Sequence, residues 1–377
     1  MPELPGYLQL MGAGHLLGYI VGLFTLGALL SRFFSGKIAD KAGRKVVMII
    51  GTAVTAIAGF LYVLIHFFYT SNQDDLETGM LGVWLFLGLR FFHGLSTGFR
   101  PAGSSALLTD IVPVDRRGEA LGYLGVAGNT GMAGGPALGS LLTVEYGYEE
   151  MFICSSLLGI VALLFTLKLP ETLPNARPIR PSDLNVFKGK NFEISVWPAS
   201  LSLLPVACAF GVFLTITPDF VSGLGYQYKG VFNTIIVVAS ISMRFVAGKA
   251  SDRFGREPIL AIGGFLLFLG MGILSYSTTQ LWAAIGGVVY GLSIGINMPT
   301  IFAWTADLAP KGKIALAIGT TLVSLELGIG LGAFISGSLF SSDYTWLPLL
   351  YRFCAISGLI MALVLLFAKR KPMTSVN

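Results

Sequence analysis

Long apolar runs separated by short polar gaps dominate this sequence. Gly14 to Leu30 is one such run, and the stretch that ends in SGLIMALVLLFA is another. An α-helix needs about 20 apolar residues to cross a bilayer. The runs lie near that length, the mean hydropathy is +0.75, and only 12% of the residues are charged. These features predict an all-α polytopic membrane protein and argue against a soluble fold.

Eleven apolar runs are long enough to form helices. They cover roughly residues 13–34, 46–69, 80–110, 118–142, 149–169, 194–218, 230–247, 258–277, 281–308, 314–338 and 347–368. The longest polar gap, 170–192, contains four prolines, which favour an extended linker. We therefore expect an N-terminal bundle over 1–169 and a six-helix C-terminal bundle over 193–377.

Basic residues gather in alternate loops. Of the 25 Lys and Arg residues, 19 lie in one set of loops and ends, whereas the opposite set holds only Lys229. Acids such as Asp75 and Glu77 lie in that opposite set. Because cytoplasmic loops carry an excess of Lys and Arg, the first set and the C-terminus are predicted to face the cytoplasm.

A charged phrase occurs twice in this apolar chain. RFFSGKIADKAGRK at Arg32–Lys45 returns as RFVAGKASDRFGRE at Arg244–Glu257, with seven of fourteen positions identical at an offset of 212. A second echo pairs GLSTG at Gly94–Gly98 with GLSIG at Gly291–Gly295, at an offset of 197. The offset of 197 also joins Asp110 to Asp307. Parallel repeats of membrane helices are typical of secondary transporters.

The phrase resembles a signature of the major facilitator superfamily (MFS), G-x-L-A-D-R/K-x-G-R-R/K, which lies between helices two and three. Its second copy resembles the counterpart between helices eight and nine. The resemblance implies two pseudo-symmetric bundles and a latch that holds the cytoplasmic side shut. The implied latch residues are Gly36, Asp40, Gly43, Arg44, Gly248, Asp252, Gly255 and Arg256.

Helix-end chemistry offers a physical basis for this latch. We expect Gly43 to allow a tight turn, and Asp40 to lie against a helix N-terminus, whose dipole favours an anion. Arg44 is expected to reach acids on adjoining loops. The alternative is that these charges only fix the topology.

A glycine pattern in the fourth run resembles the signature of the proton-driven antiporter branch, G-x8-G-x3-G-P-x2-G-G. It consists of Gly122, Gly131, Gly135, Pro136 and Gly139, with Ser140 in place of the last glycine. Glycines at every fourth position form a smooth ridge that suits close helix packing. We therefore predict a packing contact along this ridge, and the resemblance adds a seal against ion leakage.

The start of the chain departs from the family pattern. PELPGYLQLMG resembles the outer loop that follows helix one, so we expect the first of the family's twelve helices to be absent from this sequence. A truncated gene model is the favoured explanation, and a chain that truly lacks this helix is the alternative.

Ionisable side chains inside spans point to function because they are costly in a bilayer. Glu326 lies near the middle of a run, and we predict contact with protons or substrate; a simple tie between helices is the alternative. Arg90, His93 and Arg100 share one arc of about 80° on a helix. Arg90, followed by Gly94 and Gly98, also resembles the helix-four element linked to proton coupling.

The remaining predictions concern polar residues with weaker patterns. His93 also fits a hydrogen-bonded packing residue, and Arg100 fits a structural role or contact with an anion. Asn129 and Asn297 are predicted to line the cavity. The arginines near predicted span ends are expected to extend toward the interface. These are Arg32, Arg244 and Arg352.

No nucleotide-binding loop, zinc-protease motif or paired-cysteine motif is present, so we expect no cofactor, no metal and no enzymatic activity. The favoured function is export of drugs, sugars or other small molecules in exchange for protons. The expected partners are substrate, protons and lipid rather than nucleic acid, in a monomer of the bacterial inner membrane. The alternatives are an importer or facilitator and a non-transporting membrane protein.

Overall fold

The computed structural model describes residues 2–72, 75–113, 116–178, 192–310, 313–340 and 346–367. Within these ranges the chain forms a short helix, α1 (Leu4–Leu10), and eleven helices of at least 21 residues. The long helices are α2 (Leu17–Ala42), α3 (Arg44–Ser71), α4 (Leu76–Ile111), α5 (Arg117–Glu145), α6 (Tyr148–Lys168), α7 (Trp197–Gly223), α8 (Lys229–Phe254), α9 (Arg256–Tyr276), α10 (Gln280–Leu308), α11 (Ile314–Phe340) and α12 (Leu347–Phe367). The all-α prediction and the eleven expected helices are confirmed.

Most of these helices suit a membrane. In the described ranges, nine are long and apolar enough to cross one, or ten if α8 counts as a single span. The axis of α8 bends by 43° between Lys229–Arg244 and Val246–Phe254, whereas α2 forms one span with the preceding turn. The chain is therefore a multi-pass membrane protein.

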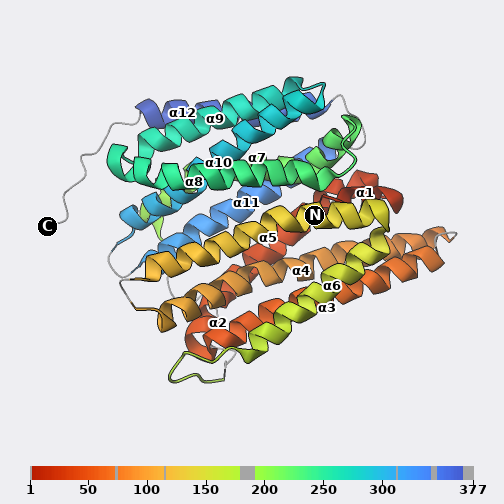
Figure 1. Cartoon of the computed structure of the whole chain (residues 1–377), viewed down its shortest axis with the longest axis horizontal. Coiled ribbons are helices and arrows are strands. Elements are labelled where there is room, and N and C mark those ends of the chain that lie inside the picture. Colours follow the sequence, from red (N-terminus) through yellow and green to blue (C-terminus); the bar gives the residue numbers. More distant parts are fainter. Residues whose placement is uncertain are drawn as a thin grey trace.

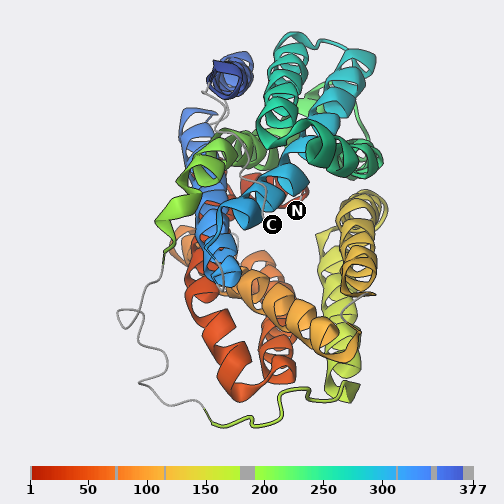
Figure 2. The same cartoon turned by 90° about the vertical axis from the view of Figure 1, so that its left-hand side faces the viewer.

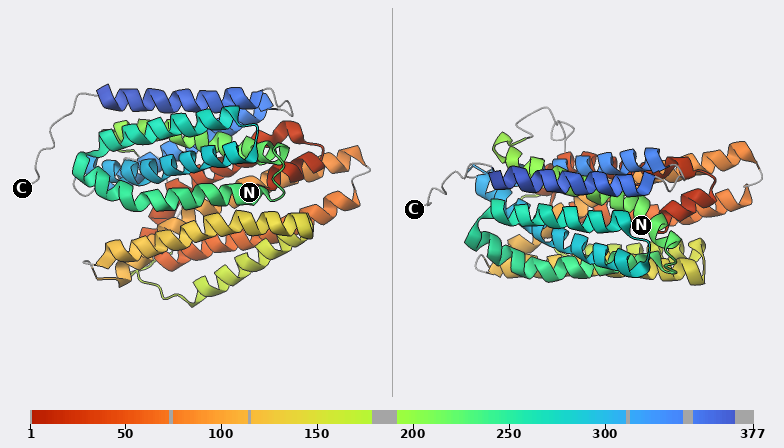
Figure 3. Two further views of the ribbon diagram at one scale, coloured as in Figure 1. Left: turned by 45° about the horizontal axis from the view of Figure 1, so that its top comes forward. Right: turned by 90° about the horizontal axis from the view of Figure 1, so that it is seen from above.

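The helices run roughly parallel along the long axis and form two groups (Figure 1). We call α1–α6 the N-terminal half and α7–α12 the C-terminal half. The largest contacts between the halves are those of α2 with α11 and of α5 with α8. Viewed end-on, the halves lie one above the other (Figure 2), and α12 and α6 lie at opposite outer edges (Figure 3, left). The division at 170–192 stays a prediction, because 179–191 lie outside the described residues.

The charged phrase is mostly helical, which the sequence analysis did not predict. Helix α2 continues to Ala42 and α8 to Phe254, well past the predicted ends at 34 and 247. Only one residue in each copy breaks the helix, Gly43 with φ of 123° and Gly255 with φ of 93°. These left-handed conformations favour glycine, and a new helix begins at the next residue. We call the end of the bundle that contains Gly43 and Gly255 the strap end, and the opposite end, which contains α1, the α1 end.

The segment that was expected to be an outer loop instead forms the buried helix α1. Tyr7 is fully buried, and its ring lies 5.3 Å from that of Phe86 and 5.2 Å from that of Phe152, centroid to centroid. Its hydroxyl lies 3.2 Å from His66 Nδ1. The loop prediction failed because aromatic packing against α3, α4 and α6 stabilises a helix too short to form alone.

The glycine ridge on α5 does not form the packing contact that was predicted. A Cβ added at Gly131 or Gly135 would meet no atom within 4 Å, and one at Gly139 would only reach Met151 Sδ at 4.0 Å. Gly122 lies in α5, but its surroundings fall outside the described residues. Close packing in this pattern is instead found at Pro136, whose carbonyl oxygen faces Gly230 of α8. The role of the ridge as a seal stays a prediction.

Candidate functional site

A buried ion pair joins the two halves. Arg32 on α2 donates to Glu326 Oε1 on α11 through NH2 at 2.6 Å and Nε at 3.0 Å. The Arg32 side chain is 15% exposed and that of Glu326 is 5% exposed. The expectation that Arg32 extends toward the interface is therefore wrong, because a buried carboxylate on the facing helix offers a stronger partner.

Closer to the α1 end, the same helix pair crosses backbone to backbone. A Cβ added at Gly18 on α2 would lie 2.7 Å from the carbonyl oxygen of Ala333 and 3.2 Å from Gly337 Cα on α11. The other pair crosses in the same way, because Gly230 on α8 directly faces the carbonyl oxygen of Pro136 on α5. Glycine is needed at both crossings because a side chain would displace the facing backbone.

Polar contacts reinforce this end. Gln9 on α1 donates to Asp219 Oδ2 on α7 at 2.8 Å, and the Tyr228 hydroxyl donates to Glu145 Oε1 at 2.6 Å. Thr234 on α8 also donates to the carbonyl oxygen of Ala133 on α5 at 3.0 Å. The two halves therefore hold together at the α1 end through several independent contacts.

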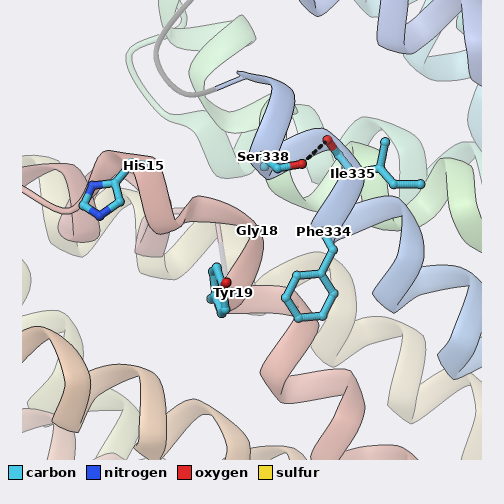
Figure 4. A pocket seen from close by; sticks show the side chains of 7 residues that line it. His15, Gly18, Tyr19, Phe334, Ile335 and Ser338 are labelled. Atoms are coloured by element: carbon cyan, nitrogen blue, oxygen red, sulfur yellow. Dashed lines mark hydrogen bonds between the residues drawn. The ribbon is translucent and has the colours of Figure 1, made fainter.

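A small cleft lies at the rim of the α2–α11 crossing. It measures about 240 Å³, and the rings of Tyr19 and Phe334 meet edge to face beside it (Figure 4). His15 and Ser338 also line it, and both are exposed. None of the predicted site residues lines this cleft, so we do not assign it to transport.

The conspicuous arginine of α4 packs against α2. Arg90 is 1% exposed, donates from Nε to the carbonyl oxygen of Ile20 at 3.1 Å, and lies 4.5 Å above the Phe24 ring. Its NH1 also donates to the Tyr62 hydroxyl at 3.3 Å, and that hydroxyl lies 3.4 Å from His93 Nδ1. The structure thus brings Arg90 and His93 together through Tyr62.

The other predicted site residues lie apart from Glu326's ion pair. Arg100 is exposed, and its stem packs near Gly51 of α3. Asn297 is buried against Gly263 of α9, and its Nδ2 donates to Ser293 Oγ at 3.1 Å. Asn129 is half-buried on α5. A transport role for these residues stays a prediction.

The two copies of the charged phrase form matching ion-pair clusters at the strap end. Arg44 Nε binds Asp110 Oδ2 at 3.0 Å, and its NH1 binds Asp40 Oδ1 at 3.3 Å. In the second copy, Arg256 Nε binds Asp307 Oδ2 at 2.8 Å, and its NH1 binds Asp252 Oδ1 at 2.5 Å. The sequence echo between Asp110 and Asp307 reflects this shared geometry.

Comparison with known proteins identifies the family of this chain. A sequence model of the Major Facilitator Superfamily matches residues 1–324 and 230–377. The chain belongs to this superfamily. An MFS-type transporter of Methanocaldococcus jannaschii is 26% identical, over 96% of this chain and 92% of that protein. The quinolone resistance protein NorA of Staphylococcus aureus is 24% identical, over 90% of this chain and 85% of NorA.

Another relative and one solved structure extend the comparison. A homolog of the multi-drug resistance efflux pump PmrA from Lactococcus lactis is 25% identical, over 90% of this chain and 83% of the homolog. The inward-open xylose transporter XylE of Escherichia coli is 16% identical with a TM-score of 0.74, covering 96% of this chain and 88% of XylE. The named MFS relatives and neighbours are transporters rather than enzymes.

The strap end of this MFS chain also contains a carboxylate that sequence reasoning missed. Glu171, just after α6, accepts hydrogen bonds from the backbone N–H groups of Arg44 at 2.9 Å and Lys45 at 3.0 Å. It therefore occupies the N-terminus of α3, which was expected for Asp40; the Asp40 side chain is instead 75% exposed and binds Arg44. The available signal was an acid beside a proline where the linker begins.

Backbone contacts change the acidity of Glu171. Partial burial alone would raise the pKa of its carboxyl, but hydrogen bonds from the backbone N–H groups of Leu173, Arg44, Lys45 and Thr172 outweigh burial and lower that pKa below its ordinary value. The N–H of Arg177 also donates to the carbonyl oxygen of Lys41 at 2.9 Å. These contacts attach the start of the linker to the N-terminal half.

Proposed function

We propose that this transporter exports a small molecule in exchange for protons, and that Glu326 carries the proton. The observation that carries the proposal is the buried Arg32–Glu326 ion pair between the halves. Transport by alternating access requires the contact between the halves to change. Because the ion pair at this contact includes a carboxylate that can be protonated, it can couple the motion of the halves to protonation.

The energetics of a buried ion pair make this coupling strong. Removing one partner of such a pair costs about 3–5 kcal/mol, because the other charge is left without compensation. The α2–α11 contact therefore cannot open while Arg32 and Glu326 are both charged and have no other partner. A proton and Arg32 compete for the same carboxylate of Glu326, so protonation weakens the tie and frees Arg32 for another anion.

The position of the pair suits a proton site in the membrane interior. Glu326 is the thirteenth of the 27 residues of α11, so it lies near the middle of that helix. The apolar core of a bilayer is about 30 Å thick. The pair thus lies near its middle, while the glycine crossings hold the α1 end together. With the strap end facing the cytoplasm, as the loop charges predict, this arrangement fits the inward-open state named for the similar XylE structure.

The direction of transport rests on the relatives. NorA and the PmrA homolog are named for drug resistance and efflux, which favours export of drug-like compounds by this chain. XylE is described as a xylose transporter, so a sugar importer is the second candidate. Ser140 departs from the antiporter glycine pattern and is therefore compatible with this candidate. We further propose a monomer in a bacterial inner membrane with a cytoplasmic C-terminus.

Proteoliposomes that contain the purified full chain test this function. With an imposed proton gradient, we expect accumulation of a quinolone, and a smaller or no response to xylose. Glu326→Gln should reduce gradient-driven transport at least tenfold, because the side chain can no longer exchange a proton. The matched control is Glu145→Gln, which changes a glutamate at the α1 end that binds Tyr228 instead of Arg32.

A paired variant separates coupling from stability. Arg32→Met together with Glu326→Leu replaces the ion pair with apolar side chains and should restore folding without restoring proton coupling. Wild-type coupling in Glu326→Gln would contradict the proposal. Xylose uptake that persists after the gradient is collapsed would favour the facilitator.

A further inference from the structure

The repeat that relates the two halves also relates the two helix pairs that join them. The offset of 212 takes Gly18 on α2 to Gly230 on α8, and the offset of 197 takes Pro136 on α5 to Ala333 on α11. These four residues form the two backbone crossings. The structure therefore confirms that α2–α11 and α8–α5 are equivalent contacts in the same register.

The same offsets identify the counterpart of the Arg32–Glu326 ion pair. Arg32 corresponds to Arg244 on α8, and Glu326 corresponds to Asn129 on α5. One contact thus carries an arginine facing a carboxylate, and the other carries an arginine facing a neutral amide.

Helix geometry places Arg244 on the α5-facing side of α8. Gly230 and Thr234 contact α5, and Arg244 lies within about 80° of both around the helix at 100° per residue. Asn129 lies within about 40° of Ala133 and Pro136, the two α5 residues whose carbonyl oxygens meet α8. Both side chains therefore belong to the faces that the two helices turn toward each other.

Arg244 nevertheless has no counter-charge in the described part of the chain. Its Nε is buried without a hydrogen-bond partner, and no described residue forms an ion pair with it. The bend of α8 follows directly after it. Arg352 provides a contrast, because it lies 4.6 Å above the Tyr276 ring and its Nε lies 3.4 Å from Ser275 Oγ. A guanidinium left inside the membrane without such support is costly.

We propose that Arg244 and Asn129 bind an oxyanion, a carboxylate or phosphate group of the transported molecule. The proposal rests on the proposed transport function and names the chemical class of its substrate. The anion takes the place at α5–α8 that Glu326 occupies at α2–α11. Guanidinium and amide N–H groups are both donors, and arginine binds oxyanions in a bidentate fashion. Arg244 is the counterpart of Arg32, whose partner Glu326 lies near the middle of α11 and therefore deeper than a lipid headgroup normally lies.

Binding to the purified full chain in phosphatidylcholine nanodiscs tests the proposal. The probes are 2-naphthoate and its neutral analogue 2-naphthamide, measured by equilibrium dialysis. We expect naphthoate to bind at least tenfold more tightly than naphthamide. Arg244→Gln should remove this preference, and Arg244→Lys should retain part of it because the positive charge remains. The control Arg352→Gln should leave the preference unchanged.

Equal affinity for the two probes, or a naphthoate preference that survives Arg244→Gln, would overturn the proposal. Nanodiscs with added phosphatidylglycerol separate the two sources of an oxyanion, since competition by this lipid through Arg244 would overturn the assignment to a transported molecule. A wild-type chain that binds naphthoate through Arg244 but shows no proton coupling would contradict the proposed function alone.

Discussion

The two largest contacts between the halves share a backbone geometry and differ in charge. At α2–α11 and at α5–α8, a glycine near the α1 end of one helix meets a carbonyl oxygen of the other. Farther toward the strap end, the first contact contains the Arg32–Glu326 ion pair, whereas the second contains Arg244 and Asn129 without a hydrogen bond between them. The repeat has kept the steric requirement and changed the electrostatic one.

This difference shows which part of a repeat is constrained by packing. A helix crossing tolerates only a small residue, because the facing backbone cannot move without separating the helices. The charged positions lie farther along the same faces, where the partner can be a side chain or another anion. One contact is then suited to a proton and the other to a ligand.

The largest effect is expected from filling the crossings. Gly230→Ala and Gly18→Ala should each destabilise the protein by about 1–3 kcal/mol, since the added methyl group meets backbone instead of a movable side chain. Thermal unfolding in detergent measures this loss. The matched control is Gly128→Ala on α5, where a Cβ meets no atom within 4 Å and helix propensity favours alanine. If only one of the two crossings proved sensitive, their equivalence would be wrong.

An intermediate effect is expected from making the two contacts alike in charge. Asn129→Asp places a carboxylate opposite Arg244, as Glu326 lies opposite Arg32. Because this carboxylate competes with the ligand, naphthoate affinity should fall at least tenfold, or about 1.4 kcal/mol. Equilibrium dialysis measures the change, and Asn129→Gln, which keeps the amide, serves as the control. Unchanged affinity in Asn129→Asp would show that position 129 does not face Arg244.

The smallest effect is expected at the strap end. There, Glu171 of the linker binds the start of α3, which follows the first copy of the phrase. Among the described residues, no linker carboxylate binds the start of α9 in the second copy. The pKa of Glu171 is lowered in the folded protein, so its contribution is present at neutral pH and is lost as pH falls through this lowered value. Glu171→Gln should cost less than about 1 kcal/mol at pH 7, because the group is largely exposed.

Amide exchange reports this contribution locally. At neutral pH, Glu171→Gln should exchange faster than wild type at the Arg44 and Lys45 amides, and the difference should vanish as the pH falls through the lowered pKa of Glu171. Glu257→Gln, in the first turn of α9, is the counterpart control and should leave α3 unaffected. A difference that persists at acidic pH would show that the cap does not depend on the charge of Glu171.

Much of the fold followed from patterns that act locally along the chain. The apolar runs predicted eleven helices, and the doubled phrase indicated the family and a contact of Arg44 with acids. The helix ends were less predictable, because charged positions such as Lys37 and Lys41 continue α2 and only Gly43 ends it. Charge marks a loop in membrane topology rules but does not by itself break a helix.

The site was less predictable because it depends on pairs far apart in the sequence. Glu326 was identified as a buried acid, but nothing local indicated that Arg32, 294 residues away, would bind it. Glu171 was missed for the same reason, since its partners are the first two residues of α3. The predicted ridge at Gly131 and Gly135 failed because spacing shows that a helix can be packed closely, not that a described helix packs there.

The sequence by itself determined the membrane class, the number of long helices and the internal repeat, because hydrophobicity and glycine conformations are properties of short segments. Only the tertiary structure decided which charges are paired. Arg32 and Arg244 occupy equivalent positions in the repeat. The Glu326 carboxylate on the facing helix neutralises Arg32, whereas Arg244 has no described partner. Coulomb interactions in a low-dielectric interior depend on distances of a few ångströms, and those distances are fixed by helix packing.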